Sequence, residues 1–430
     1  MTRFPNSLLG LVALGAAGLA SLSAQTSSNS PQGRWDAAFT LNQTVIPFRL
    51  DVSREGSSFR GILYNGDQKE TTTSATFENG KLTLNFDQYL TRITASVEND
   101  QLTGTVDGRF EPGRYISSYP LTATRHIDVA DSSPSDAPEI GGNWEIEYES
   151  LKGEKAWRFI VNQHGADVSA AILRVDGDTG TLVGRYKDGK FLLSHFEGVR
   201  PLVAEITAEP DGSLRIQLKG AHAPTEPLVA WRPEVARSKG LPEPADFMTH
   251  TTVRDPNERF SFAFPDFSGK IVSSEDPLFK GKAYLAIVTG TWCPNCHDET
   301  PYLVQLYGKY HSHGLEIVAL DFEEPEQQED LSRAKAFIKK YNVPYTYLIA
   351  GTPSELGEKV PQVVNLNTWP ATFFVGKDGR VRKIHAGFAA PATGAFNAEL
   401  QSEYTHEIET LLAEDPAQSA TSRPSTNAKN

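Results

Sequence analysis

Cysteine is scarce in this chain. Its 430 residues contain two cysteines, Cys293 and Cys296, and two methionines. A framework of structural disulfides is therefore excluded, and at most one disulfide can close within the chain. Basic residues are also in the minority, with 41 Lys and Arg against 54 Asp and Glu, so the formal net charge is −13. An acidic surface disfavours nucleic acid and anionic lipid as partners.

Long apolar runs are missing after the N-terminus. No later run reaches the roughly 18 apolar residues that a membrane span requires, so we do not expect an integral membrane protein. The N-terminus has Arg3, an apolar run over residues 8–20 and small residues up to Ala24, which predicts a cleavable signal peptide over residues 1–24. An uncleaved anchor is the alternative, disfavoured because the apolar run is short. We therefore expect a periplasmic or secreted protein.

The two cysteines form a Cys-x-x-Cys motif. They lie in Trp292-Cys293-Pro294-Asn295-Cys296, directly after an apolar run at residues 284–288 and directly before a helical pattern at 294–313. If Cys293 sits at the start of that helix, the amide N–H groups and the helix dipole stabilise its thiolate. Cys296 lies one turn further along, within reach of the first sulfur. This spacing predicts a redox disulfide between Cys293 and Cys296.

Covalent haem attachment is an alternative, because Cys293, Cys296 and His297 satisfy C-x-x-C-H. It is disfavoured, since a second axial ligand would have to come from elsewhere and the preceding buried strand has no role in a haem site. A zinc site is disfavoured because His297, His311 and His313 have no standard ligand spacing. An inert structural disulfide is disfavoured because closing so short a loop gains little unfolded-state entropy. We therefore expect no cofactor and no metal.

Downstream motifs resemble a known family. A proline precedes a strong strand in Thr368-Trp369-Pro370-Ala371-Thr372-Phe373-Phe374-Val375, and Cys296-His297-Asp298-Glu299-Thr300-Pro301 places a carboxylate and then a proline after the second cysteine. Together with an opening hairpin segment at 262–282, these motifs resemble the TlpA/ResA-like disulfide oxidoreductases of the thioredoxin superfamily over residues 255–414. The resemblance implies a thioredoxin-like α/β fold in which Pro370 is cis, packs beside the cysteines and shapes the substrate groove.

One strand residue departs from the thioredoxin pattern. Thioredoxins carry a buried aspartate where this chain has Ile287. Glu299 lies on the same helix face as Cys296 and is the predicted proton acceptor or donor for that thiol, with a simple first-turn charge as the alternative. Trp292 and Trp369 are predicted to flank the cysteines as an apolar rim of the substrate groove, although core packing suits Trp369 equally well.

Residues 33–230 have a different pattern. Short alternating apolar segments are separated by Asn-Gly, Asn-Asp and Asp-Gly turns, which is typical of antiparallel strands. Gly33-Arg34-Trp35 recurs as Gly142-Asn143-Trp144, and Asn79-Gly80-Lys81-Leu82 recurs at the same offset as Asp188-Gly189-Lys190-Phe191. We predict two homologous tandem all-β units, each a small antiparallel barrel or sandwich of about seven strands, with Trp35 and Trp144 as core anchors.

The predicted organisation is multidomain, with two all-β units followed by an α/β thioredoxin-like domain. The predicted segments are a signal peptide at 1–24, all-β units at 31–128 and 139–232, a linker at 233–256, the redox domain at 257–414 and a disordered tail at 415–430. The acidic segment 323–330 is expected to be a solvated loop and helix start. Because the chemistry is local to the redox domain, we expect a fragment cut within 240–256 to fold and act alone.

These features predict an extracytoplasmic thiol:disulfide oxidoreductase in which Cys293 attacks and Cys296 resolves. The family resemblance implies reduction of a disulfide-containing protein substrate and a membrane electron donor that re-reduces the cysteines. A peroxiredoxin is disfavoured, because the threonine expected three residues before its reactive cysteine is Gly290 or Cys293 here. A ligand- or partner-binding β protein with an accessory redox domain is the alternative from another class.

Overall fold

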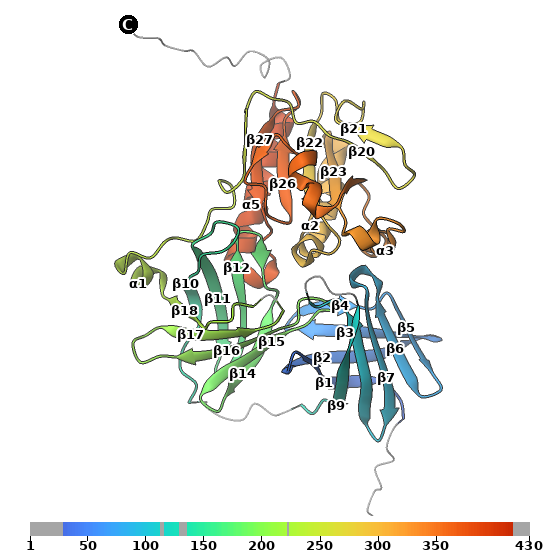
Figure 1. Ribbon diagram of the computed structural model, residues 1–430, viewed down its shortest axis with the longest axis vertical. Helices are drawn as coiled ribbons and strands as arrows, with labels where there is room; N and C mark the ends of the chain where they lie inside the picture. Colours follow the sequence, from blue (N-terminus) through green and yellow to red (C-terminus); the bar gives the residue numbers. More distant parts are fainter. Residues whose placement is uncertain (1–28, 112–115, 129–135, 222, 416–430) are drawn as a thin grey trace, which may run out of the picture.

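Three bodies of structure follow one another along the computed structural model, which describes residues 29–111, 116–128, 136–221 and 223–415 (Figure 1). Two β units, coloured blue to teal and green, lie beneath a C-terminal body coloured yellow to red. The predicted signal peptide at 1–24, and all but the first residue of the predicted tail at 415–430, lie outside the described residues. Within the described ranges, no helix is long and apolar enough to cross a membrane.

The first β unit is one antiparallel sheet of nine strands. The strands are β1 (Gly33–Leu41), β2 (Thr44–Glu55), β3 (Ser58–Asn65), β4 (Gln68–Thr71), β5 (Ser74–Glu78), β6 (Lys81–Phe86), β7 (Thr91–Glu98), β8 (Gln101–Gly108) and β9 (Ser117–Arg125). Their order is β4-β3-β2-β1-β9-β8-β7-β6-β5, so the pairing of β1 with β9 joins two meanders. In β1, Trp35, Phe39 and Leu41 are buried and alternate with more exposed residues, as a strand with one face in the core requires.

The second β unit is a closed antiparallel barrel. Its strands are β10 (Gly142–Glu147), β11 (Ala156–His164), β12 (Asp167–Arg174), β13 (Gly177–Asp178), β14 (Leu182–Lys187), β15 (Lys190–His195), β16 (Leu202–Ala208), β17 (Leu214–Lys219) and β18 (Leu228–Trp231). The order is β11-β10-β18-β17-β16-β15-β14-β12-β13, and β11 also pairs with β12, which closes the ring. Each sheet has nine strands where about seven were expected, because short strands such as β13 carry no readable alternation.

The two β units begin and end in the same way. Trp35 and Trp144 are buried in the first strands of their sheets, and each indole N–H donates to a carbonyl oxygen four residues earlier, at 2.9 and 2.8 Å. Arg125, at the end of β9, lies over the Trp35 ring with its guanidinium carbon 3.9 Å from the ring centroid. Arg232, directly after β18, lies over the Trp144 ring in the same way, at 3.8 Å. This repeated closure accounts for the recurrence of Gly-x-Trp in the sequence.

The loop after β15 joins the two β units. Phe196 is fully buried in the core of the first unit, with its ring centroid 4.8 Å from Phe39 and 5.0 Å from Phe48. Its backbone N–H and carbonyl pair with the Asn65 side chain, both at 3.0 Å. Because the second unit supplies a core residue of the first, the two cannot be treated as independent modules.

The C-terminal body is an α/β domain with a central five-stranded sheet in the order β24-β23-β22-β26-β27. Its strands are β22 (Ala283–Thr289), β23 (Leu315–Phe322), β24 (Thr346–Gly351), β26 (Ala371–Val375) and β27 (Val381–Ala386). Every residue of β22 and β23 is buried, as expected of inner parallel strands covered on both faces. The helices are α2 (Pro294–Tyr310), α3 (Ser332–Tyr341), α4 (Leu356–Lys359) and α5 (Ala395–Ala413).

The segment between the second barrel and this domain is partly folded onto its neighbours. It contains α1 (Pro233–Ser238) and β19 (Thr252–Val253), and β19 pairs with β25 (Val363–Val364). Phe247 stacks on His385 at 5.3 Å between ring centroids, and its carbonyl accepts a hydrogen bond from Ala386 at 2.9 Å. A hairpin of β20 (Ala263–Pro265) and β21 (Ile271–Ser273) then opens the domain, where the sequence predicted one.

The second β unit and the C-terminal domain share a hydrophobic core. Ile160 on β11 and Leu173 on β12 belong to the cluster that contains Leu303 of α2 and Leu400 of α5. Burial of this kind stabilises a contact by about 25 cal/mol per Å² of apolar surface. The expectation that a fragment cut within 240–256 folds and acts alone is therefore disfavoured, because the cut would expose this surface.

Candidate active site

The two cysteines lie at the start of α2. Cys293 is the N-cap residue, and its carbonyl oxygen accepts hydrogen bonds from the amides of Cys296 and His297 at 3.1 and 3.3 Å. Both thiols are free, with 4% of Cys293 and 1% of Cys296 exposed. The Cys293 thiol donates to the carbonyl oxygen of Trp369 at 3.3 Å. Burial, and then the adjacent Cys293, raises the pKa of the Cys296 thiol well above its usual value, which favours the protonated form of that residue.

The turn before Cys293 is held by a buried ion pair. The backbone N–H of Thr291 donates to Glu323 at 2.8 Å, and its hydroxyl contacts the same carboxylate. Arg333 on α3 pairs with Glu323 at 2.6 Å and with Glu324 at 2.8 Å. Glu323 is fully buried, so the expectation that the acidic segment 323–330 is solvated is wrong at its start. The charge pattern of the segment alone does not reveal that Arg333, on the later helix α3, is buried against Glu323.

Glu299 lies on the buried face of α2, with 1% of the residue exposed. Its Oε1 atom accepts hydrogen bonds from Thr372 on β26 at 2.7 Å and from Tyr404 on α5 at 3.0 Å. Burial raises the pKa of Glu299 to about 7, against the lowering effect of these two hydroxyls. Burial and then the charges of Glu299 and Cys296 raise the pKa of Tyr345. Glu299 is thus a carboxyl that can exchange a proton near neutral pH.

The predicted groove residues lie over the first cysteine. The Trp369–Pro370 peptide bond is cis, and the carbonyl of Pro370 accepts a hydrogen bond from Gly387 at 2.8 Å. Trp292 and Trp369 meet edge to face with ring centroids 5.2 Å apart. Trp292 also donates to the carbonyl of Phe322 at 2.9 Å, so both tryptophans are half-buried with fixed orientations.

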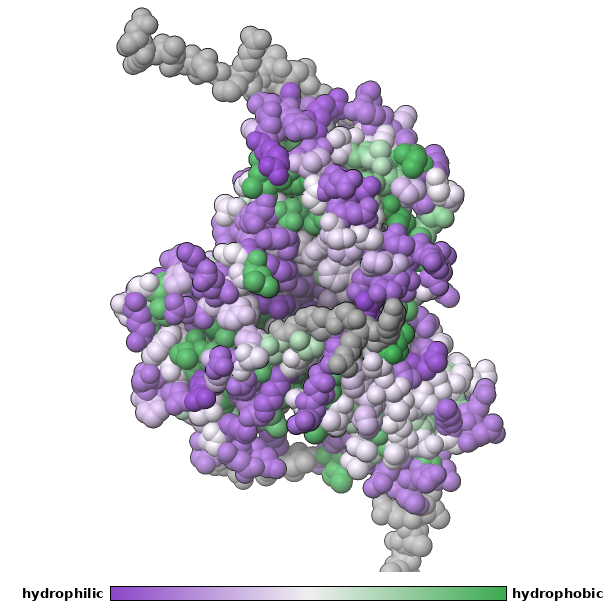
Figure 2. All heavy atoms as spheres, in the orientation of Figure 1, coloured by the Kyte–Doolittle hydropathy of each residue, from purple (hydrophilic) through white to green (hydrophobic). Residues whose placement is uncertain are grey.

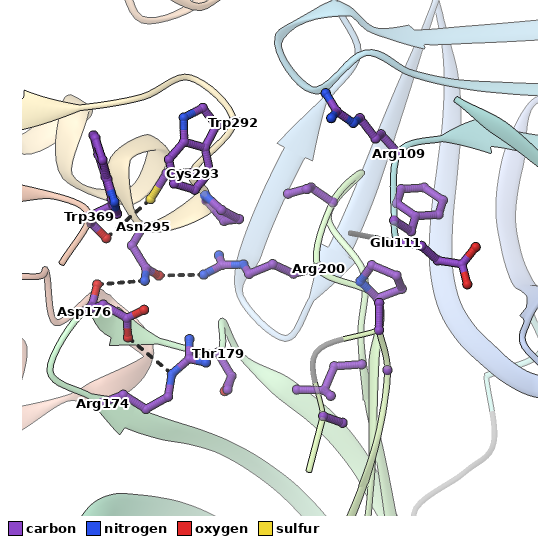
Figure 3. A pocket seen from close by; sticks show the side chains of 18 of the residues that line it. Arg109, Glu111, Arg174, Asp176, Thr179, Arg200, Trp292, Cys293, Asn295 and Trp369 are labelled. Atoms are coloured by element: carbon purple, nitrogen blue, oxygen red, sulfur yellow. Dashed lines mark hydrogen bonds and ion pairs between the residues drawn. The ribbon is translucent and has the colours of Figure 1, made fainter. Parts of the chain in front are cut away.

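The second barrel contributes residues to the same site. Asn295, which lies between the cysteines, accepts a hydrogen bond from Arg200 at 2.7 Å and donates to the carbonyl of Asp176 at 2.8 Å (Figure 3). Arg200 also pairs with Glu197 at 2.6 Å and with Asp298 at 3.0 Å. Burial raises the pKa of Asp298 to about 8 against the lowering effect of Arg200. Burial opposes ionisation of Glu197, but Arg200 lowers its pKa to about 2.

A cavity of about 610 Å³ opens onto Cys293. Both β units and the C-terminal domain line it, and Figure 3 shows Arg109 on one side and Arg174, Asp176 and Trp369 on the other. This volume suits a small molecule or a short segment of polypeptide.

His297 has no free ring nitrogen to offer a haem iron. Its Nδ1 atom lies 3.0 Å from the Tyr341 hydroxyl, and its Nε2 atom lies 2.8 Å from the carbonyl oxygen of Thr291, so Nε2 donates and Nδ1 accepts. Burial lowers the pKa of His297 to about 3. Haem ligation would break both contacts, which disfavours the C-x-x-C-H alternative.

The sequence prediction named the cysteines, Glu299, Pro370 and the two tryptophans, and the structure gathers them around the start of α2. It missed Arg200, Asp176 and Tyr404 at the same place. Asp176 lies in the β12–β13 turn, directly before Gly177, whose φ of 123° lets the backbone pass Asn295 with no room for a Cβ atom. A glycine within an alternating pattern was the one signal that could have indicated a close approach there.

Comparison with known proteins identifies relatives of the C-terminal domain. Residues 256–384 match the family described as AhpC/TSA family. A thiol-disulfide oxidoreductase ResA of Bacillus cereus is 34% identical over 121 residues, which are 28% of this chain and 63% of that protein. ResA of Bacillus subtilis is 27% identical over 143 residues, or 33% of this chain and 73% of that protein. The chain therefore spans less than two thirds of the Bacillus cereus relative, and the family match at 256–384 lies outside the two β units.

Solved structures show the same partial coverage. A thiol:disulfide interchange protein of the thioredoxin family from Chlorobium tepidum shares 24% identity, covers 37% of this chain and 99% of its own, and has a TM-score of 0.28. The resemblance inferred from the motifs around Cys293 and Pro370 is confirmed by the ResA relatives.

Proposed function

We propose, from the premise that the C-terminal domain is thioredoxin-like and homologous to the ResA thiol-disulfide oxidoreductases, that this chain exchanges disulfides through Cys293 and Cys296 outside the cytoplasm. The observation that carries the proposal is the pair of free thiols at the N-terminus of α2, beside a cis-proline and an open cavity. A dithiol at this spacing can be oxidised to an intramolecular disulfide and reduced again by thiol–disulfide exchange.

The reaction is a two-step transfer. The Cys293 thiolate attacks one sulfur of a substrate disulfide, the substrate S–S bond breaks, and the departing sulfur takes up a proton. Cys296, as a thiolate, then attacks the Cys293 sulfur, which releases the second substrate thiol and leaves a Cys293–Cys296 disulfide. Two electrons pass to the substrate and the two cysteine protons end on its thiols.

Glu299 is proposed as the proton acceptor for Cys296. The thiol of Cys296 is held in its protonated form by burial, so the resolving step needs a base. With a pKa of about 7, Glu299 is near the operating pH, one helical turn from Cys296. The hydroxyls of Thr372 and Tyr404 hold the Glu299 carboxylate in one position, so the proton leaving Cys296 has a fixed acceptor.

The biological setting follows from the family. We propose that the chain is exported by the signal peptide at 1–24 and acts as a reductase of disulfide-containing proteins, re-reduced by a membrane electron donor. The domain limits at 31–128, 139–232 and 257–414 are proposed with it, and the repeated Trp and Arg closure supports descent of the two β units from one ancestor.

A reductase assay tests the proposal. The full chain should accelerate reduction of insulin disulfides by dithiothreitol, and Cys293→Ser should abolish the acceleration. Cys296→Ser should instead accumulate mixed disulfide on Cys293, visible by mass spectrometry. If wild type and both variants give the same rate, the thiols do not carry the activity, and the β-domain binding function becomes the better explanation.

A further inference from the structure

The attacking cysteine faces a walled cavity rather than an open surface. Cys293 is 4% exposed and lines the 610 Å³ cavity, together with residues of both β units. The face drawn in Figure 2 is mostly hydrophilic, with small separate hydrophobic groups among its coloured residues. Substrate selection is therefore expected inside the cavity, where the substrate disulfide must meet Cys293.

The lining carries an excess of positive charge although the chain is acidic. Five basic residues line the cavity against three acidic residues, whereas the whole chain has a net charge of −13. The basic residues are Arg109, Lys152, Arg174, Arg200 and Arg333. A concave site with walls of one sign of charge concentrates ligands of the opposite sign.

The excess lies in the second barrel. Arg109 and Arg333 share Glu324, and each has a further acidic neighbour, so that side is balanced. On the other side, Lys152 and Arg174 share the carboxylate of Asp176, at 2.6 and 3.5 Å, and the charge of Arg174 also acts on Asp178, which does not line the cavity.

Arg174 has unused hydrogen-bonding capacity. Its buried Nε atom faces Oδ1 of Asp176 at 3.5 Å, which is long for a hydrogen bond, and its two terminal nitrogens have no hydrogen-bond partner among the described residues. Figure 3 shows its guanidinium group between Asp176 and Thr179, on the same side of the cavity as Cys293. A guanidinium group binds a carboxylate through two parallel N–H donors, so this is the place for a substrate carboxylate.

We propose that this cavity binds a disulfide that carries a carboxylate, with Arg174 and Lys152 holding the carboxylate while Cys293 attacks the disulfide. Trp157, Trp292 and Trp369 also line the cavity and cover the carbon chain next to the sulfur. This inference rests on the proposed function and names its substrate class. The carboxylate has two sources, a low-molecular-weight disulfide or an acidic residue beside a cysteine in a polypeptide.

The chemistry is the two-step transfer described above, with no added cofactor. The substrate disulfide is reduced to two thiols, and the Cys293–Cys296 dithiol is oxidised to the disulfide. For one turnover the protein itself supplies the two electrons and both protons.

Single-turnover kinetics with matched disulfides test the proposal. Reduced full chain is mixed with oxidised glutathione or with cystamine, which has amines and no carboxylate, and each rate is divided by the rate of dithiothreitol with the same disulfide. The normalised rate should be about tenfold or more higher for oxidised glutathione. A second pair of substrates, two peptide disulfides that differ only in Glu or Lys beside the cysteine, separates the two sources.

Variants test whether the second β unit determines the preference for a carboxylate. Arg174→Gln and Lys152→Gln should each lower the ratio of the oxidised glutathione rate to the cystamine rate by about tenfold, since each removes a charged donor. Arg215→Gln is the matched control, because Arg215 is exposed on β17 and does not line the cavity. Added salt should lower the ratio in wild type, which gives a result even if a variant fails to fold.

The outcomes are distinct. Carboxylate preference in either substrate pair, lost in the two variants, supports the proposal, and the peptide pair then tells which source is used. A ratio near one in wild type for both pairs, or a ratio unchanged in both variants, overturns it. If wild type reduces none of these disulfides and no insulin, the proposed function itself fails.

Discussion

Replacement of Glu299 by Gln should stabilise the protein at alkaline pH while slowing its chemistry. Burial raises the pKa of Glu299 from 4.5 to about 7. Because burial raises the folded-state pKa, the contribution of Glu299 to the free energy of unfolding is fully present below the unfolded pKa of 4.5. It is lost as the pH rises through about 7. At ~1.4 kcal/mol per pKa unit, the loss amounts to about 3 kcal/mol of unfolding free energy. Gln has the size of protonated Glu and still accepts hydrogen bonds from Thr372 and Tyr404.

Urea unfolding of the reduced full chain checks the thermodynamic part. Glu299→Gln should match wild type near pH 4 and exceed it by about 3 kcal/mol near pH 8.5, whereas Glu358→Gln, at an exposed position on α4, should behave as wild type at both. Stopped-flow resolution of the mixed disulfide should slow by about a hundredfold near neutral pH and recover at alkaline pH. Equal stability of Glu299→Gln and wild type at alkaline pH, or an unchanged resolving step, would refute the reasoning.

Three further changes probe the rest of the account. Limiting alkylation of the reduced protein near neutral pH should modify Cys293 before Cys296, because burial raises the pKa of the Cys296 thiol, and faster labelling of Cys296 would reverse their roles. Arg200→Met should cost about 3–5 kcal/mol of unfolding free energy by leaving Glu197 and Asp298 unpaired, whereas exposed Arg215→Met should cost little. Phe196→Ala should cost about 3–5 kcal/mol through a cavity in the core of the first β unit, with Leu192→Ala, 43% exposed, as control; similar losses for the pair would argue against that core contact.

Local patterns predicted the C-terminal elements well. The apolar run at 284–288 and the helical pattern from Pro294 become β22 and α2, although α2 ends at Tyr310 and a 3-10 turn covers His311–His313 before Gly314, where φ is 100°. In α5, Leu400, Tyr404 and Ile408 recur at helical spacing and are buried. These signals are periodic and local, so one sequence suffices to read them.

Contacts between segments far apart in the chain could not be predicted from the sequence. Nothing near Arg200 indicates that its guanidinium group reaches Asn295, and the loop that carries Phe196 shows no sign that its ring enters another sheet's core. Glu323 looked solvated because its partner Arg333 comes from a later helix. Such pairings depend on how whole domains pack, which periodicity does not encode.

The reduction potential of the cysteine pair tests the central claim most directly. The full chain is equilibrated over a series of glutathione redox buffers, and the Cys293–Cys296 disulfide is quantified by thiol trapping and mass spectrometry. The account predicts a single two-electron transition, in which the ratio of disulfide to dithiol changes tenfold for each ~30 mV, and its loss in Cys293→Ser. Thiols that stay reduced across the whole series, or a transition unaffected by Cys293→Ser, would contradict it.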